Sequence, residues 1–191
     1  MYTIEEIKLI LKSMLSKKRY IHSLNVADES VKLAERWGGE NEKKKAYLAG
    51  LIHDACKDMP QDEQKLLVEK SSGVCNVELE TPALWHSVAG AWYVKNRFYI
   101  DDEDIINAVR YHTSARAGMS RLEEIIYMAD LISADRSYSD VEKVRKLAYS
   151  SLEKAMLYAL KFSIIEVAGK GSKIPINTIE AYNQYTSAGK I

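Results

Sequence analysis

The chain has 191 residues, of which 47% are hydrophobic and 28% charged, which is enough for one well-packed core and short for two domains. Lysine plus arginine and aspartate plus glutamate each total 27, so the formal net charge is zero. This balance excludes the basic excess of a nucleic-acid-binding surface and the acidic tail of a solvating segment. No run approaches the ~20 apolar residues of a membrane span, and the N-terminus carries charges where a signal peptide needs an apolar centre. We therefore expect a single domain over residues 1–191 that is cytoplasmic and has no nucleic-acid or membrane partner.

Only three prolines and nine glycines interrupt the sequence, and the segments between them show helical periodicity. The predicted fold class is therefore all-α. The first helix is expected to begin at a capping box formed by Thr3 and Glu6 and to run to about Ser16.

The second and third predicted helices each place polar side chains among apolar residues, where a side chain of that kind needs a partner. The second helix has two apolar sides before the glycines at positions 38 and 39, so it is expected to run through the core. His22 lies on one of these sides, one turn before Val26. A third helix, from about Asn41, becomes increasingly apolar and delivers His53 and Asp54 at or near its end. An ionised aspartate in such a stretch needs a cation or good hydrogen bonds to replace its lost hydration.

The middle of the chain supplies two further histidines. A short acidic helix is expected after the proline at position 60, and Thr81 followed by Pro82 predicts the start of another, with threonine as cap. That helix carries His86, and Gly90 one turn later suggests that another segment approaches its backbone. The following helix, opened by acidic residues at 101 and 104, points His112 in the same direction as its apolar residues.

The last third of the chain supplies a second unexplained aspartate. Ser120 and Glu123 form another capping box, and the helix that they begin contains Asp130 as the sole charge in an apolar run. One long helix from about Ser139 towards Gly169, and a final helix from about residue 177, complete the chain.

All four histidines therefore fall on apolar helix faces or at helix ends, together with two aspartates: His22, His53, His86, His112, Asp54 and Asp130. Imidazole and carboxylate together suit a divalent transition metal such as iron, manganese or zinc, whereas calcium and magnesium prefer oxygen ligands. Any single histidine is more simply a core residue with a satisfied hydrogen bond, and a metal-free network of the six is an alternative. Six such positions together favour a metal site.

The order of these residues over successive helices resembles the HD-domain superfamily of metal-dependent phosphohydrolases. The surrounding sequence is similar to that of the YqeK family within it, in the segments RYIHS (19–23), HDACKD (53–58), HS (86–87), HTSARAGM (112–119), IIYMAD (125–130) and NTIEAYN (177–183). The similarity covers nearly the whole chain. The resemblance implies a single HD-domain helical bundle with the metal site in the core between helices.

The resemblance also implies an activity, that of a symmetrical bis(5'-nucleosyl)-tetraphosphatase, in which a metal-activated water splits diadenosine tetraphosphate into two ADP. Iron is the metal implied first, with manganese or zinc as alternatives, and one or two ions are expected. The positions that match the family's metal ligands are His22, His53, Asp54 and Asp130. A second ion would be held by Asp54, His86 and His112.

The catalytic residues expected from this reading are Asp54, Lys57, His86 and His112. Asp54 would orient the attacking water, Lys57 would reach a phosphate as a point charge, and a protonated His86 or His112 would assist the departing oxyanion. Substrate contacts are expected from His22, Asp54, Lys57, His86, His112, Thr113, Arg116, Asp130 and Arg136. For Lys57, Arg116 and Arg136, an ordinary solvated role is an equal rival.

Two other functions remain open from the sequence. One is an HD phosphohydrolase that acts on another nucleotide, although Lys57 stands where alarmone hydrolases carry a glutamate. The other is a non-catalytic HD module that senses nucleotides, although no metal-ligand position has been lost. The expected partner is a dinucleoside polyphosphate or a nucleoside diphosphate, and a homodimer is left open.

Overall fold

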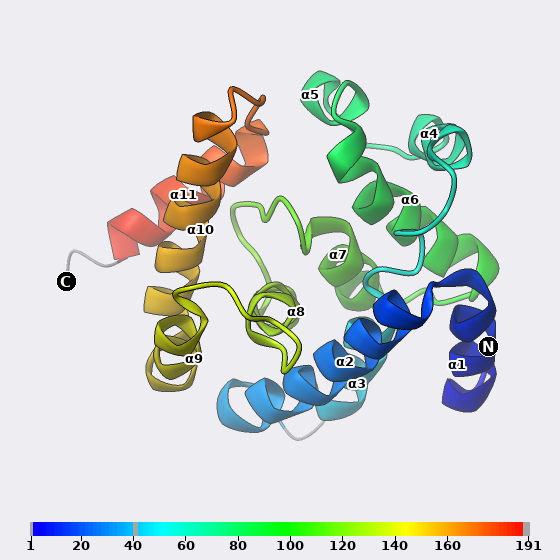
Figure 1. The fold of residues 1–191 in the computed structure, drawn as a ribbon, viewed down its shortest axis with the longest axis horizontal. Helices are drawn as coiled ribbons and strands as arrows, with labels where there is room; N and C mark the ends of the chain where they lie inside the picture. The colour runs from blue at the N-terminus through cyan, green and yellow to red at the C-terminus, as the bar shows by residue number, and fades with distance from the viewer. Residues whose placement is uncertain (1, 40–41, 189–191) are drawn as a thin grey trace.

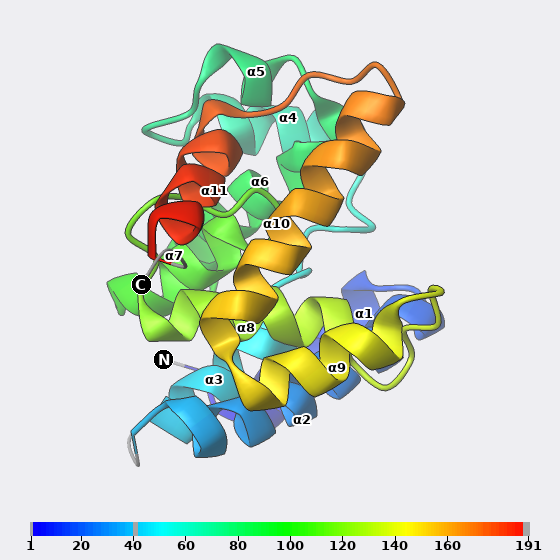
Figure 2. The ribbon, with the colours of Figure 1, turned by 90° about the vertical axis from the view of Figure 1, so that its left-hand side faces the viewer.

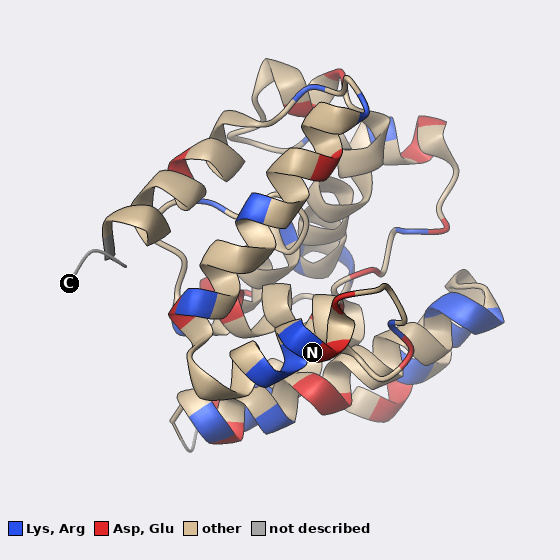
Figure 3. Ribbon diagram, turned by 60° about the vertical axis from the view of Figure 1, so that its left-hand side comes forward, with Lys and Arg blue, Asp and Glu red and all other residues tan. Residues whose placement is uncertain are grey.

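The computed structural model describes residues 2–39 and 42–188, and every regular element within these ranges is an α-helix (Figure 1). The predicted all-α class is therefore confirmed. The helices are α1 (Ile4–Met14), α2 (Lys17–Trp37), α3 (Glu42–Ile52), α4 (Gln61–Glu69), α5 (Asn76–Leu79), α6 (Pro82–Arg97), α7 (Glu103–Tyr111), α8 (Arg121–Ile132), α9 (Val141–Ser150), α10 (Leu152–Gly169) and α11 (Ile176–Ala188). Acidic and basic residues are interspersed along them (Figure 3).

Most helix ends follow the local chemistry of the sequence. Both expected capping boxes are present, at the starts of α1 and α8. Pro82 occupies the first turn of α6, as predicted, but Thr81 does not cap that helix with its side chain. The Thr81 hydroxyl instead donates to the carbonyl of Val77 at 2.6 Å. None of the described helices is both long and apolar enough to cross a membrane.

The long helix expected from residue 139 to 169 is in fact two helices. α9 and α10 are separated by Ser151, whose backbone is extended (φ −160°, ψ 108°) and whose hydroxyl accepts a hydrogen bond from the amide of Lys154. The break changes the direction of the chain. Figure 2 shows α9 lying near α2, while α10 runs on at an angle towards the far end of the molecule, where it packs on α11.

Close helix packing brings the predicted site elements together. α2 packs along α3 and α8, and a Cβ on Gly50 of α3 would lie only 2.7 Å from Ser30 Oγ and 2.9 Å from Ala27 Cα. α6 packs on α7, where a Cβ on Gly90 would lie 3.2 Å from Val109 Cγ1, in line with the close approach expected at this glycine. The α2–α3 and α6–α7 pairs consequently meet at the end of α3.

Candidate metal centre and substrate cleft

The six predicted metal-site residues converge in the core from five elements. His22 lies on α2, His86 on α6 and Asp130 on α8, and His112 is the C-cap of α7. α3 ends at Ile52, so His53 and Asp54 lie in the turn that follows it and not within the helix. All six are buried except Asp130, which is partly buried. Overlapping groups of three of these residues place their ligand atoms within 4.8 Å of one another.

The first group of ligand atoms surrounds one point between α2, α8 and the turn after α3. His22 Nε2 lies 2.9 Å from Asp130 Oδ1, and His53 Nε2 lies 3.8 Å from the same oxygen. Asp54 Oδ2 lies 3.4 Å from His53 Nε2 and 4.0 Å from His22 Nε2. Such separations suit four atoms around one divalent ion with bonds of about 2.0–2.2 Å.

The second group uses the other oxygen of Asp54. Asp54 Oδ1 lies 3.5 Å from His86 Nε2 and 3.5 Å from His112 Nε2. The carboxylate of Asp54 therefore stands between the two groups and presents one oxygen to each.

Hydrogen bonds at the far side of the rings orient two of the histidines. His53 Nδ1 donates to the carbonyl of Gly50, and His112 Nδ1 donates to that of Val109, each at 2.7 Å. The proton on Nδ1 leaves Nε2 of each ring with a lone pair that faces the cluster. His53 Nε2 and Asp54 Oδ1 are buried and have no hydrogen-bond partner. Because a buried acceptor without a partner is costly, these atoms fit a divalent cation better than a metal-free network.

Three side chains around the cluster hold its ligands in place. His22 Nδ1 donates to Asp135 Oδ2 at 2.8 Å, and Arg19 Nη1 donates to Asp54 Oδ2 at 2.7 Å. Arg136 donates to Asp130 through Nη2 to the carboxylate and through Nε to the backbone carbonyl. Arg136 was expected from the sequence, but Arg19 and Asp135 were not.

The electrostatics of the cluster keep its carboxylates ionised. Burial alone would raise the pKa of Asp54, but the neighbouring His53 and His112 outweigh it and hold that pKa well below its usual range. Burial is likewise outweighed at Asp130, whose pKa is lowered by the neighbouring His22, His53 and Arg136. Two negative charges are thus concentrated in the core, which favours a cation.

Lys57 and His86 lie in contact with each other beside Asp54. Lys57 Nζ lies 3.1 Å from His86 Nε2, and Thr113 Oγ1 lies 3.1 Å from the same nitrogen. Burial lowers the pKa of His86 well below its usual value, so its ring is neutral near pH 7. Assistance to the departing oxyanion by a protonated His86 or His112 stays a prediction.

A cavity of about 230 Å³ opens over the cluster between α8 and α10. Lys57, Thr113 and Arg136 line it, as expected for substrate contacts, together with Arg19, Asp54, His86, His112, Tyr127, Asp130, Leu131, Ala159, Phe162, Ser163 and Glu166. A second cavity, of about 250 Å³ and mostly apolar, shares Thr113 and Ser163 with the first. The two cavities are therefore neighbours: the first lies at the cluster and is polar, and the second lies between α6 and the α10–α11 connection and is apolar.

Two of the expected substrate contacts, His22 and Arg116, do not line these cavities, and Arg116 is paired elsewhere. Its guanidinium donates two hydrogen bonds to the buried carboxylate of Glu123, at 2.6 and 2.7 Å. Glu123 also accepts from the amide of Ser120 in the capping box of α8. Arg116 therefore fastens its loop to the start of α8 and does not face the cluster.

The helical fold and the buried histidine–aspartate cluster define an HD-domain protein, and the HD domain family model matches residues 19–135. A relative from Bacillus subtilis (strain 168), named a symmetrical bis(5'-nucleosyl)-tetraphosphatase, is 36% identical over 183 residues, which are 96% of this chain and 97% of the relative. A relative of the same name from Halalkalibacterium halodurans is 34% identical and covers 92% of each chain. The chain belongs to this family of symmetrical bis(5'-nucleosyl)-tetraphosphatases within the HD-domain proteins.

A solved structure agrees with the assignment of the fold. The crystal structure of a predicted HD superfamily hydrolase involved in NAD metabolism, from Clostridium acetobutylicum, superposes with a TM-score of 0.93 at 36% identity. The match covers 98% of this chain and 99% of that one.

Proposed function

We propose that this chain is a metal-dependent phosphohydrolase that cleaves diadenosine tetraphosphate symmetrically into two ADP. The observation that carries the proposal is the Asp54 carboxylate, which is ionised and buried between two groups of imidazoles at the floor of a cleft lined by cationic side chains. The names of relatives that match nearly the whole chain support the choice of substrate.

The proposed metal is iron, with manganese and zinc as alternatives, because all three accept imidazole together with carboxylate. His22, His53, Asp54 and Asp130 would hold it, and His86 and His112 would join Asp54 in holding a second ion. When bound, a divalent metal supplies an acidified water and positive charge next to the phosphoryl oxygens.

In the proposed reaction, the oxygen of water forms a bond to one of the two inner phosphorus atoms. The bond from that phosphorus to the oxygen that bridges the inner phosphates breaks, and the bridging oxygen leaves as part of the second ADP. With an ion in the first group only, Asp54 would orient the water through the oxygen that faces His86 and His112, which has no hydrogen-bond partner among the described residues. With a second ion bound, that oxygen would hold the ion instead. This step requires that the polyphosphate lie along the cleft with its centre at the cluster.

The cationic and hydroxyl side chains of the polar cavity would bind the phosphates. Lys57 is mostly buried, so its ammonium group interacts with a phosphate in a medium of lower polarity than water. Arg19 and Arg136 add positive charge at the rim, and the Thr113 hydroxyl lies where the polar and apolar cavities join. The apolar cavity would receive one nucleoside. We also propose that residues 1–191 act as a single HD domain.

Incubation of the iron-loaded protein with diadenosine tetraphosphate in ¹⁸O-enriched water tests the proposal. ADP is expected as the sole nucleotide product, with one ¹⁸O in one ADP of each pair. AMP and ATP as products would contradict symmetrical cleavage. Binding without turnover would favour a sensing module, and faster turnover of a different nucleotide would favour the other class of HD phosphohydrolase.

A matched variant separates chemistry from folding. In Asp54→Ala, turnover and most of the bound metal should be lost while the helical circular dichroism is retained. Turnover by a metal-stripped Asp54→Ala protein would show that the cluster is not the catalytic centre.

A further inference from the structure

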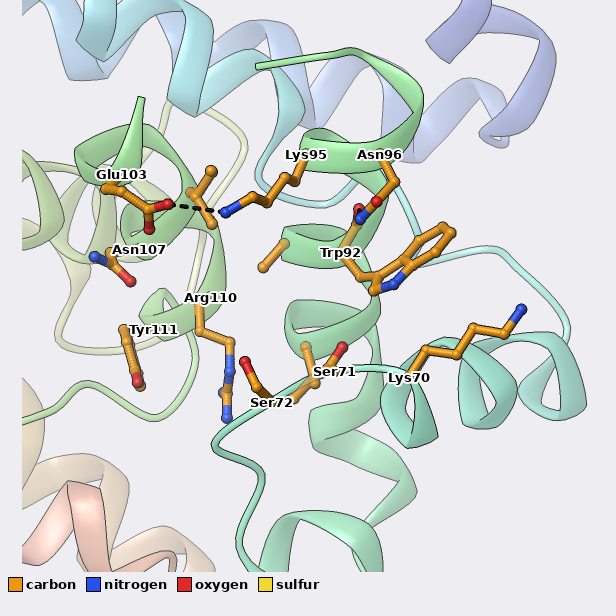
Figure 4. Close-up of a pocket in the computed structure, with 13 residues that line it drawn as sticks. Lys70, Ser71, Ser72, Trp92, Lys95, Asn96, Glu103, Asn107, Arg110 and Tyr111 are labelled. Carbon is orange, nitrogen blue, oxygen red and sulfur yellow. Dashed lines mark hydrogen bonds and ion pairs between the residues drawn. The ribbon is translucent and has the colours of Figure 1, made fainter. Parts of the chain in front are cut away.

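A larger hollow, of about 490 Å³, lies between α6 and α7, and it shares no lining residue with the catalytic cleft (Figure 4). α6 contributes Trp92, Lys95 and Asn96 to its wall, and the segment that follows α4 contributes Ser71 and Ser72. From α7 come Glu103, Asn107, Arg110 and Tyr111. The hollow is within the range of about 300–1,000 Å³ typical of small-molecule sites.

Arg110 is the feature of this hollow that packing does not explain. Its side chain extends from α7 towards Ser72, as Figure 4 shows, and the residue is only 7% exposed. Nη2 donates to Glu78 at 2.8 Å, whereas Nη1 is buried and has no hydrogen-bond partner. The buried Glu78 carboxylate balances the charge of Arg110, so the group left to satisfy is the Nη1 donor. An anionic oxygen of a ligand could accept from it once the side chain shifts to meet the ligand.

Two lysines add positive charge that a ligand can recruit. Lys95 pairs with Glu103 at 3.0 Å, but both side chains are more than half exposed, so the pair is weak and opens at little cost. The Lys70 ammonium lies over the ring of Trp92, 5.7 Å from its centroid, and none of the described carboxylates pairs with it. Lysine and arginine therefore outnumber carboxylates in the lining of the hollow, with Lys70, Lys95 and Arg110 against Glu103.

The remaining wall suits a planar, polar group. Trp92 is half-buried and offers an indole face, on which a nucleobase can replace the Lys70 ammonium. The Asn107 amide and the Ser72 hydroxyl line the hollow, and neither makes a hydrogen bond with the described part of the chain. Amide and hydroxyl groups can both donate to and accept from a base or a ribose.

We propose that the α6–α7 hollow is a second ligand site, which binds a nucleoside phosphate with its phosphate at Arg110 and Lys95 and its base on Trp92. This proposal does not depend on which substrate the catalytic cleft hydrolyses.

The side-chain signals of the chain's three tryptophans test the site in solution. The zinc-loaded, ¹⁵N-labelled protein is titrated with AMP, and the Trp92 indole signal is assigned from its absence in Trp92→Phe. A saturable shift of the Trp92 signal is expected, while that of Trp37, whose indole donates to the carbonyl of Ala148, stays in place. Absence of a Trp92 shift at millimolar AMP would overturn the proposal.

Two variants assign the shift to this hollow. Lys95→Gln removes only an exposed charge, so the fold is kept, and it should weaken the AMP-induced Trp92 shift about tenfold in apparent affinity. Arg136→Gln, in the catalytic cleft, should leave that shift unchanged. If Arg136→Gln weakened the Trp92 shift and the variant in the hollow did not, AMP would bind in the catalytic cleft, and the proposal would be overturned.

Inorganic phosphate separates the contribution of the base from that of the anion. Stacking predicts that AMP binds about fivefold to a hundredfold more tightly than phosphate, and that Trp92→Leu, followed by calorimetry, abolishes this difference. Equal affinity of the intact protein for AMP and phosphate would rule out a nucleoside phosphate as the ligand.

Discussion

Asp135 controls the orientation of His22, because it accepts the Nδ1 proton and so turns Nε2 towards Asp130. Removing this acceptor in Asp135→Ala should lower the affinity for the metal about 10–100-fold, since ligand imidazoles depend on such partners. Competition with a chelator measures the change. Asp28→Ala, at an exposed position on α2, the helix that carries His22, is the control. Equal metal affinity in the two variants would show that Asp135 does not position His22.

Lys57 differs from the ligands because its contacts lie on the cleft side of the cluster, at His86. Lys57→Met should lower kcat/KM for diadenosine tetraphosphate by about tenfold or more, the effect of losing a charged hydrogen bond, with metal content unchanged. Steady-state kinetics with metal analysis checks this. Lys65→Met, exposed on α4, is the control, and unaltered kinetics in Lys57→Met would support an ordinary solvated lysine.

The contact of α2 with α3 depends on Gly50. In Gly50→Ala the new methyl group would collide with the backbone of α2 at Ala27, and the gain in helix propensity cannot offset an overlap with main-chain atoms. We expect a loss of about 1–3 kcal/mol in the free energy of unfolding, measured by urea denaturation in a fixed metal state. Gly169→Ala, at the end of α10 with no atom within 4 Å of the new Cβ, is the control and should not destabilise the protein. Wild-type stability in Gly50→Ala would mean that α2 can move away freely.

Helix ends that are set by nearby residues were predictable from the sequence, and helix ends without such a signal were not. The capping boxes of α1 and α8 need only residues three apart, so the sequence contains the full signal. The break at Ser151 lies between two segments that both keep helical periodicity, and an extended backbone there is open to any residue. Ser151 caps α10 locally, but a serine within a helical run is a weak signal. The contacts of α9 with α2 and of α10 with α11 accompany the change of direction.

Some residues of the site, like some helix ends, had a signal in the sequence, and others did not. The six residues of the cluster stood out because histidines and lone carboxylates are conspicuous in apolar helices. Arg19 and Asp135 gave no such signal, since arginine and aspartate at a helix start or in a loop are usually solvated. From the sequence, Arg116 could be either a substrate contact or a solvated residue. In the structure it pairs with Glu123, a contact that no spacing rule indicated.

Stability of the whole molecule should depend on the metal. Arg19 and Arg136 pair with Asp54 and Asp130, but the buried His53 Nε2 and Asp54 Oδ1 have no hydrogen-bond partner among the described residues, and a bound ion would satisfy them. At free metal a thousand times above the Kd, binding contributes about 4 kcal/mol to the free energy of unfolding. For a chain of this size we expect chelation to lower the Tm by roughly 10 °C. Scanning calorimetry with and without chelator measures this, and His53→Ala should respond much less. An unchanged Tm on chelation of the intact protein would show that the cluster is stable without an ion.

The position of Asp54 between the two ligand groups makes their affinities interdependent. Because one carboxylate serves both, an ion in the group containing His22 and His53 draws on the same negative charge that the group containing His86 and His112 requires. Filling either group must change the affinity of the other by the same factor, whichever fills first. The protein should therefore take up metal in two unequal steps, with negative cooperativity, and the second step should be the one most easily reversed by competing ligands.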